Sequence, residues 1–340
     1  GAGTTAPALA QASFTGIGTR PFLLMNGRKV DPVFWHGIRS VTKGRLFEFD
    51  LAASAGIENF RMVVDFYDFW KGEKKYDFSA FDASIDYLLS VSPDAVFAIQ
   101  VYAHMPEWWL AANPDDTTAH FNGRPRFHDR DKQALASKKW LTDAEAPLKA
   151  LIDHIKSRSW ADRVWGMTVA ENGNGEWFWG NSDDNRNPSF AGFSPADHAT
   201  FRAYLKEKYR TDVALAAAWS QPGVTFATAA LPDPNQAAKG RIGMLLDVQC
   251  DRQLIDWFEF RNRALGEAII HFAKFIKEQT GNRWLTGAYY GYHLELAENN
   301  SLPLQITGHN AVWEVVKSPW VDFVHGPSRY TYRKTGMADA

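Results

Sequence analysis

The chain has 340 residues, 45% of them hydrophobic, and a formal net charge of −2 at pH 7. This length suffices for one large α/β domain or two ordinary ones, and the near-neutral charge gives no field that would attract nucleic acid or anionic lipid. No run of eighteen apolar residues is present, so the sequence predicts no membrane-spanning helix. The single cysteine, Cys250, excludes an internal disulfide and a zinc site built from thiolates.

Residues 1–13 are rich in Gly, Ala, Thr and Pro and carry no charged side chain, so we expect a disordered N-terminal lead-in. Within it, residues 8–12 (ALAQA) resemble the small-residue end of a secretion signal, although no charged region or apolar core precedes them. A secreted or periplasmic location is therefore favoured over a cytoplasmic one.

Beyond this lead-in, short apolar runs alternate with amphipathic stretches, the pattern of strands and helices in turn. In chain order it predicts a strand at 33–38, a helix at 45–55, a strand at 58–66, a helix at 79–90, a strand at 95–102, a helix at 145–158, a strand at 164–169, helices at 195–209 and 252–279, a strand at 284–290, a short helix at 309–316 and a strand at 321–324. The strands are continuous apolar runs, so the repeated units indicate a parallel sheet with helices outside.

Side chains capable of chemistry gather at or after the carboxyl ends of the predicted strands. They are Asp65 and Tyr67, Tyr102 and His104, Glu171 and Glu176, Tyr290 to Glu295, and His325 to Tyr330. A (β/α)8 barrel builds its site from the loops at this face, so the distribution favours the TIM-barrel fold of the α/β class. An open doubly wound sheet is the alternative, and the sequence lacks the glycine-rich phosphate loop that would follow an early strand.

The number of strand–helix units falls short of a complete barrel, because the pattern contains about six and eight are required. Residues 181–248, between the fourth and fifth strands, form an insertion that uses part of the length. Either two strands escape the pattern, or the last quarter of the barrel lies elsewhere, and we favour the second. We therefore expect residues 14–340 to form the N-terminal three quarters of one catalytic barrel domain, which a C-terminal fragment of the same polypeptide would complete.

The stretch 164–180 gives the strongest indication of a functional site. Its apolar first part breaks into Asn and Gly residues, which suit a tight loop, and Glu171 and Glu176 lie in that break just before Trp177. Cleavage of a glycosidic bond needs an acid that protonates the bridging oxygen, and flat aromatic rings can hold the face of a sugar. The alternative interpretation is a solvated loop with core tryptophans. The chain contains 14 Trp, which favours the carbohydrate interpretation.

Several further segments follow one another in a recognisable order along most of the chain. They are FLLMNGRKVDP at 22–32, FRM at 60–62, YDFSAFD at 76–82, MPEWW at 105–109, and the stretch 201–209 followed by Leu215 and Ala218-Trp219. Together they resemble retaining glycoside hydrolases of the large (β/α)8 clan, and most closely the family 42 β-galactosidase-like proteins of bacteria. Ala216 stands where the related signature has Asn, a difference that affects packing rather than chemistry.

This resemblance implies a glycosidase that cleaves a β-linked terminal sugar by a retaining double-displacement mechanism. It favours a β-galactoside as substrate, and it leaves other sugars and the choice between exo and endo action open. A non-catalytic carbohydrate-binding relative of the same fold is the alternative, and such a protein would keep the tryptophans and lose one catalytic carboxylate.

The resemblance also implies that the acid/base glutamate follows the fourth strand and that the nucleophilic glutamate ends the seventh. Glu176 is favoured as the acid/base, because Glu176-Trp177-Phe178 matches the end of this loop in related proteins. Glu171 is the alternate, since Glu171-Asn172 reverses the usual Asn-Glu order. The nucleophile lies outside the chain if the seventh strand does, and Glu295 and Glu298 are weaker substitutes.

The remaining candidates are residues expected to contact the substrate. They are Arg61, Tyr102, His104, Trp108, Asn172, Trp177, Tyr290, His293 and Glu295. In the clan, an arginine on the second strand holds the nucleophile ionised, and the alternative for Arg61 is an ion pair with Asp65. The tyrosines that follow the fifth strand, Tyr290 and Tyr292, could steady the nucleophile or pack in the core, and the tryptophans are either sugar platforms or core residues.

We expect no cofactor and no catalytic metal. His293, Glu295, His309 and His325 could be imagined as a cluster, but none shows the spacing of the H-E-x-x-H zinc motif, and the clan's chemistry needs no metal. The expected partner is an oligosaccharide or glycoside, with neither nucleic acid nor membrane, and the insertion 181–248 could support a homo-oligomer.

Overall fold

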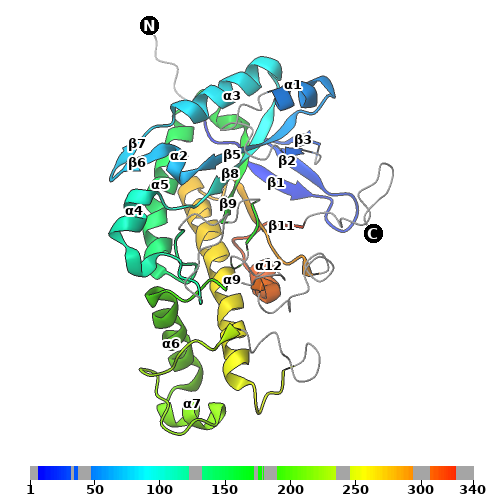
Figure 1. Cartoon of the computed structure of the whole chain (residues 1–340). Helices are drawn as coiled ribbons and strands as arrows, with labels where there is room; N and C mark the ends of the chain where they lie inside the picture. The colour runs from blue at the N-terminus through cyan, green and yellow to red at the C-terminus, as the bar shows by residue number, and fades with distance from the viewer. Residues whose placement is uncertain are drawn as a thin grey trace.

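Six parallel strands form the centre of the molecule, and each pairs with the strand that precedes it along the sheet (Figure 1). The computed structural model describes residues 7–31, 34–36, 47–121, 132–171, 175–177, 179, 190–234, 246–293 and 307–326. The strands are β4 (Trp35–His36), β5 (Asn59–Asp65), β8 (Val96–Tyr102), β9 (Val164–Ala170), β10 (Leu285–Tyr289) and β11 (Phe323–His325). All five pairings are parallel. Because the spatial order equals the chain order, the sheet is an arc of a (β/α)8 barrel, and the predicted incomplete TIM barrel is confirmed.

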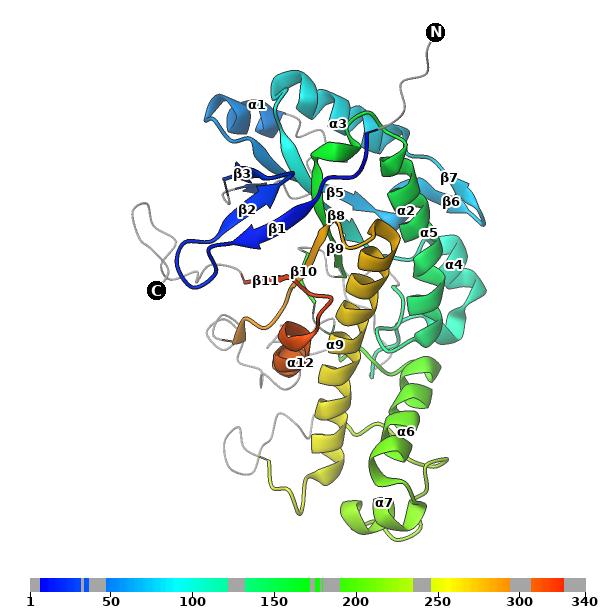
Figure 2. The same ribbon diagram turned by 180° about the vertical axis from the view of Figure 1, so that it is seen from behind.

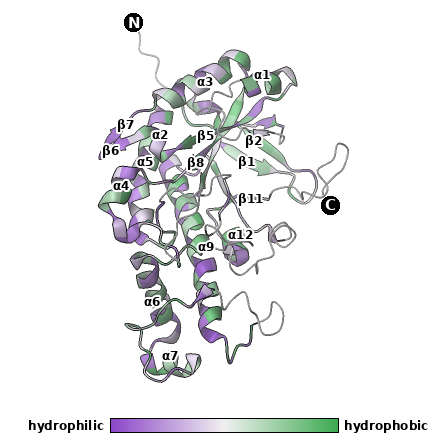
Figure 3. Ribbon diagram, viewed as in Figure 1, coloured by the Kyte–Doolittle hydropathy of each residue, from purple (hydrophilic) through white to green (hydrophobic). Residues whose placement is uncertain are grey.

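Helices cover the outer face of this arc. They are α1 (Phe47–Ser54), α3 (Ser79–Val91), α5 (Lys138–Lys156), α9 (Arg252–Thr280) and α12 (Val312–Lys317), the last preceded by the 3-10 turn η3 (His309–Ala311). Outward-facing strand residues such as Met62, Ile99 and Met167 share one buried core with helix residues such as Leu148 and Ile269. Figure 3 accordingly shows the central strands mostly in the hydrophobic colour.

Helix α5 starts seven residues before the predicted 145–158. The side chain of Ser137 accepts a hydrogen bond from the backbone N–H of Trp140 and so caps an earlier turn. Trp140 and Leu141 are buried there, which extends the apolar stripe toward the amino end. Pro147 lies inside the helix and did not end it.

A three-stranded antiparallel sheet lies against the amino ends of the barrel strands. It consists of β1 (Ala12–Thr15), β2 (Phe22–Met25) and β3 (Arg28–Val30), and β2 and β3 are joined by Asn26 and Gly27, both with positive φ. Its apolar residues, Ala12, Leu23 and Met25 among them, share a second core with Ala98, Trp165 and Leu285 of the barrel. This small sheet therefore covers the amino-terminal end of the barrel, which is called the barrel floor below.

The predicted disordered lead-in 1–13 is wrong for residues 7–13. Leu9, Ala10 and Ala12 are buried, and Ala12 begins strand β1. The backbone N–H of Ala12 donates to the carbonyl of Arg283, and the Arg283 side chain donates to the carbonyl of Leu9. Although residues 7–13 carry no charge and resemble a disordered segment, their small apolar side chains pack against the barrel floor.

The described part of the insertion 181–248 forms two helices, α6 (Pro195–Tyr209) and α7 (Asp212–Trp219). They lie beside the far half of α9, away from the sheet (Figure 2). The buried Asp256 of α9 accepts hydrogen bonds from Tyr209, Trp219 and Lys208 and so ties the insertion to this helix.

Short elements complete the described chain. They are α2 (Phe66–Phe69), β6 (Trp70–Gly72), β7 (Lys75–Tyr76), α4 (Glu107–Ala112), η1 (Pro114–Asp116) and η2 (Ala161–Arg163). Within the ranges given above, no helix has the length and apolar character needed to cross a bilayer.

Candidate active site

The carboxyl ends of β5, β8, β9 and β10 bring four of the predicted side chains to one end of the barrel. Asp65 ends β5, His104 follows β8, and Glu171 follows β9. Glu176 forms a parallel bridge with Tyr289, the last residue of β10. Glu171 and Glu176 therefore lie at the ends of neighbouring strands.

His104 connects the ends of two strands. Its Nδ1 lies 2.7 Å from Oδ2 of Asp65, and its Nε2 contacts the backbone oxygen of Glu171. The rings of Tyr67 and Tyr102 lie nearly parallel to the imidazole, with interplanar angles of 7° and 30°. Both ring nitrogens of His104 are thus engaged by the protein, and the side chain positions the main chain at Glu171.

Glu171 is a buried carboxylate with a cation beside it. Its Oε1 lies 3.8 Å from Nζ of Lys132 and 3.5 Å from the amide nitrogen of Gln133, and the residue is 4% exposed. An ammonium group at this distance favours the ionised form of a carboxyl.

Glu176 is half-buried, and neighbours on both sides hold it. The Tyr292 hydroxyl donates to its Oε1 at 2.9 Å, and the backbone N–H of the next residue, Trp177, donates to the carbonyl of Tyr289 at 3.2 Å. On the other side Gly175 has φ +95°, and a Cβ there would lie 2.6 Å from Nε2 of the buried Gln100. Only a glycine lets the loop pass this closely over Gln100 before it reaches Glu176.

Trp177 anchors the same loop in the core. The indole is completely buried and donates from Nε1 to the carbonyl of Val169 at 2.8 Å. Its ring lies against Trp140 of α5 and Phe272 of α9, with centroids 6.3 Å away in both cases. Trp177 therefore faces the outer helices and presents no ring to a sugar.

A polar layer centred on Arg61 fills the barrel interior below these carboxylates. Arg61 donates to Oε1 of Gln100 at 2.8 Å and to the hydroxyl of Tyr289 at 2.9 Å. Its guanidinium also lies 3.2 Å from Nδ1 of His36 and 3.5 Å from Nε2 of His325. Among the described residues, none of its contacts is a carboxylate, and the predicted alternative of an ion pair with Asp65 is wrong because Asp65 pairs with His104.

Burial governs the protonation of this layer. It lowers the pKa of Arg61, and it lowers the pKa of His36 to about 4 and that of His325 to about 3, with the charge of Arg61 acting in the same direction on both. Burial likewise lowers the pKa of His309 in η3 to about 3. All three imidazoles are neutral at pH 7.

The stability of the chain is therefore expected to fall in acid. The unfolded chain binds a proton on each of these histidines near pH 6.5, whereas the folded chain does so only near pH 4 for His36 and pH 3 for His309 and His325. The free energy of unfolding should drop as the pH falls from about 6.5 toward 4, by up to about 1.4 kcal/mol per pH unit for each histidine. Urea unfolding at several pH values measures this slope.

A matched pair of variants checks the assignment. His309→Gln should reduce the slope by up to one proton, because the titrating group is gone. Leu265→Ala removes a fully buried apolar side chain from α9 and should lower stability without changing the slope. An unchanged slope in His309→Gln would contradict the expectation.

The remaining predicted contacts fall into three groups. Tyr102 and Tyr290 are buried, and the Tyr290 hydroxyl donates to the carbonyl of Gly308. His293 pairs through Nε2 with Oδ1 of Asn310, and Trp108 is 37% exposed with its ring edge-on to Trp70. Asn172 and Glu295 lie outside the described residues.

The imagined metal cluster does not come together in the described part of the chain. His293 and His309 have ring centroids 6.4 Å apart, whereas His325 belongs to the layer around Arg61. No group of three or more His, Cys, Asp or Glu side chains within the described ranges has a geometry that would hold a metal ion.

Sequence reasoning missed several contacts that shape the site. Gln100 and Tyr289 hold Arg61, and Lys132 lies beside Glu171. The inward alternation of β8 offers a signal for Gln100, a polar residue within an apolar run. No local pattern marks Lys132, because it reaches Glu171 from a distant loop.

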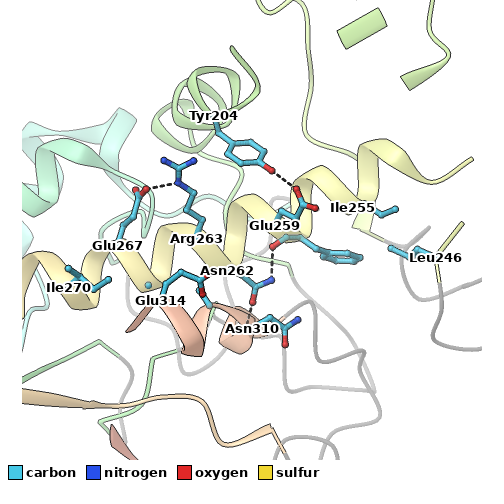
Figure 4. A pocket seen from close by; sticks show the side chains of 13 residues that line it. Tyr204, Leu246, Ile255, Glu259, Asn262, Arg263, Glu267, Ile270, Asn310 and Glu314 are labelled. Carbon is cyan, nitrogen blue, oxygen red and sulfur yellow. Dashed lines mark hydrogen bonds and ion pairs between the residues drawn. The ribbon is translucent and has the colours of Figure 1, made fainter. Parts of the chain in front are cut away.

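A cavity of about 650 Å³ opens elsewhere, on the outer face of α9 (Figure 4). Side chains of α6, α9 and α12 line it, including Tyr204, Phe258, Arg263 and Glu314. These residues come from the outer helices rather than from the ends of the barrel strands, so the cavity is separate from the cluster of carboxylates.

Comparisons with known proteins agree with this architecture. The family model Glyco_hydro_42, described as beta-galactosidase, matches residues 71–302. The β-galactosidase from the Antarctic haloarchaeon Halorubrum lacusprofundi is 17% identical with a TM-score of 0.60, and 90% of this chain covers 41% of that one. The β-galactosidase from Bacillus circulans sp. alkalophilus is 17% identical with a TM-score of 0.57, and 87% of this chain covers 39% of that one. The catalytic domain of β-amylase from Paenibacillus polymyxa is 11% identical with a TM-score of 0.65, and 86% of this chain covers 75% of it.

These low identities show the fold alone. The chain spans about two fifths of the length of the β-galactosidases it matches. Among curated proteins, none matches the sequence.

Proposed function

Since this chain belongs to glycoside hydrolase family 42, described as beta-galactosidase, we propose that it carries the acid/base half of a retaining β-glycosidase. The proposed substrate is a terminal β-galactoside, which is what the family description favours. The observation that carries the proposal is that the two glutamates after β9 have different surroundings. Glu171 is buried beside Lys132, and Glu176 is half-buried at the bridge to β10.

The surroundings of the two carboxyls divide the roles between them. A general acid must hold a proton before the glycosidic bond breaks, and a nearby cation works against this. Lys132 therefore disfavours Glu171 as the acid. The uncharged hydroxyl of Tyr292 also favours the ionised form of Glu176, but less strongly than a cation does, so Glu176 takes that role. Glu171 then accepts hydrogen bonds from sugar hydroxyls.

The nucleophile in this proposal comes from a seventh strand in a C-terminal part of the same polypeptide. Two observations support it. β4 and β11 are the outer strands of the described sheet. Arg61, in addition, is surrounded by uncharged groups in the described residues, so an incoming carboxylate would gain a charge-assisted hydrogen bond from it. In a retaining enzyme the two carboxyls stand about 5–5.5 Å apart.

The proposal includes several further features. Of the two tryptophans predicted to contact substrate, Trp108 is proposed to hold a sugar face, since it is 37% exposed whereas Trp177 is completely buried. Asn172 and Glu295 remain proposed substrate contacts. Residues 14–340 form one catalytic unit with the insertion 181–248, which is proposed to support a homo-oligomer, and the location is proposed to be secreted or periplasmic.

Hydrolysis of an aryl β-galactoside by the full-length protein tests the function. ¹H NMR of the first product should show the β-anomer, as retention requires. Glu176→Ala should lose about 10²-fold in kcat/KM with a poor leaving group and much less with an activated one, because acid assistance matters less there. Added azide should restore turnover in Glu176→Ala and yield the β-galactosyl azide.

Glu171→Gln is the matched control. It should weaken substrate binding, because the amide removes the charge and replaces one accepting oxygen with a donor, and azide should give no rescue. Rescue of Glu171→Gln instead of Glu176→Ala would reverse the two roles. Galactoside binding by calorimetry without any turnover in the wild-type protein would instead favour the non-catalytic carbohydrate-binding relative.

A further inference from the structure

His309 lies between the two segments that meet at Glu176. The imidazole is completely buried, and its Nδ1 accepts a hydrogen bond from the backbone N–H of Gly291 at 3.0 Å. On its other side lies the backbone of Trp177, the residue after Glu176. The ring therefore contacts the loop that follows β9 and the loop that follows β10.

Tyr292 packs directly on this histidine. Its ring lies edge-on to His309 with centroids 4.6 Å apart, while Tyr290 stacks on the same imidazole at 4.7 Å. At the end of β11, a Cβ added to Gly326 would lie 3.1 Å from Cβ of Tyr292. Tyr292 is thus confined between η3 and the end of β11, and its hydroxyl donates to Oε1 of Glu176.

This hydrogen bond has two chemical consequences. A donor aimed at a carboxyl oxygen stabilises the ionised form over the protonated one, so it lowers the affinity of Glu176 for a proton. It also fixes the position of Oε1 and with it the orientation of the carboxyl. Both effects serve a group that must give up its proton in one step and take one back in the next.

We propose that Tyr292, held in place by His309, is a positioning residue that fixes the carboxyl of Glu176 and sets its proton affinity. The proposal rests on the function given above, in which Glu176 is the acid/base. Titratable groups near this pair include Tyr289, which forms the bridge with Glu176, and His309, whose ring lies edge-on to Tyr292 and to His293. Burial lowers the pKa of His309 to about 3, so at neutral pH the imidazole supports Tyr292 by packing and not through a charge.

The test is Tyr292→Phe in the full-length protein, which keeps the ring and removes the hydroxyl. The pKa of the Glu176 carboxyl is read by ¹³C NMR on protein labelled at glutamate, with Glu176→Gln to assign the signal. It should rise by about half to one pH unit, the amount that one hydrogen bond accounts for. The basic limb of the kcat/KM profile for an aryl β-galactoside should move up by the same amount.

Tyr290→Phe is the matched control, because its hydroxyl bonds the Gly308 carbonyl instead of Glu176. It should leave the pKa of Glu176 unchanged, even if it lowers stability. His309→Asn should move the pKa in the same direction as Tyr292→Phe by a smaller amount, since Tyr292 loses its support. An equal pKa of Glu176 in the wild type and in Tyr292→Phe overturns the proposal.

The two readouts separate this proposal from the proposed function. The NMR titration needs no turnover, so it reports on the Tyr292 contact even in an inactive protein. A raised pKa of Glu176 together with an unmoved pH–rate profile would keep the positioning contact and remove Glu176 from the acid/base role.

Discussion

Replacing Arg61 with Met is expected to remove most of the hydrolysis by the full-length protein, while the free energy of unfolding of the 340-residue chain stays within about 1 kcal/mol of the wild type. The guanidinium is 3% exposed, and in the described chain its hydrogen bonds go to an amide, a phenol and imidazoles. Burying a charge among neutral groups costs desolvation that Met does not incur, and this offsets the lost hydrogen bonds. The loss of activity follows because the proposed nucleophile loses its charged partner.

A loss of about 10²- to 10⁴-fold in kcat/KM is expected, which corresponds to the roughly 3–5 kcal/mol that removal of one partner from a buried charge pair costs. Steady-state kinetics on an aryl β-galactoside and urea unfolding measure the two effects separately. Activity that survives Arg61→Met would contradict a role beside the nucleophile.

Arg261→Met provides the control in the same protein. Arg261 is also completely buried, between the rings of Trp179 and Trp257. Burial lowers the pKa of Arg261 to about 9, and the nearby buried carboxyl of Asp197 acts in the opposite direction. Removing this cation leaves Asp197 buried without it, so a loss of about 3–5 kcal/mol in stability is expected. Equal unfolding free energies of the two variants would show that the contrast between the two arginines is wrong.

Trp177→Ala is expected to destabilise the chain by about 3–5 kcal/mol, the range measured for truncation of buried tryptophans. The indole is completely buried, donates a hydrogen bond to Val169, and packs between α5 and α9. The same change frees the loop that carries Glu176, so kcat should fall as well. Thermal or urea unfolding gives the stability, and kinetics give the second effect.

Trp108→Ala is the matched tryptophan at the surface. With a ring that is 37% exposed, it should cost less than about 1 kcal/mol in stability. If Trp108 holds a sugar ring, KM should rise with little change in kcat. A large loss of stability in Trp108→Ala, or a small one in Trp177→Ala, would contradict the buried and exposed placements of the two rings.

The barrel strands could be predicted because each is a local pattern. The predicted run 95–102 and the observed Val96–Tyr102 differ by one residue, since both faces of the strand are buried and its residues are continuously apolar. The N-terminal sheet could not be predicted in the same way. Leu9 and Ala10 become buried only through contact with a barrel floor whose residues come from much later in the chain.

In the candidate site, too, local features could be predicted and contacts between distant segments could not. The chemical type of Glu171 and Glu176 and their place after a strand are visible in the sequence. Which of them lies beside a cation is not, because Lys132 comes from another loop. Trp177 is the clearest example of what the sequence does not reveal. A tryptophan can hold a sugar or pack in the core, and only the contacts with α5 and α9 show that Trp177 is a core residue.

The docking of the small antiparallel sheet also sets an order of events during synthesis. Residues 9–12 hydrogen-bond to Arg283 across a separation of 274 positions between Leu9 and Arg283. The segment made early therefore lacks part of its binding surface until β10 has left the ribosome, and such distant contacts are slow to form. The time at which β1 becomes resistant to a protease would accordingly show when the barrel floor is assembled. We expect this to occur well after the first helices have folded.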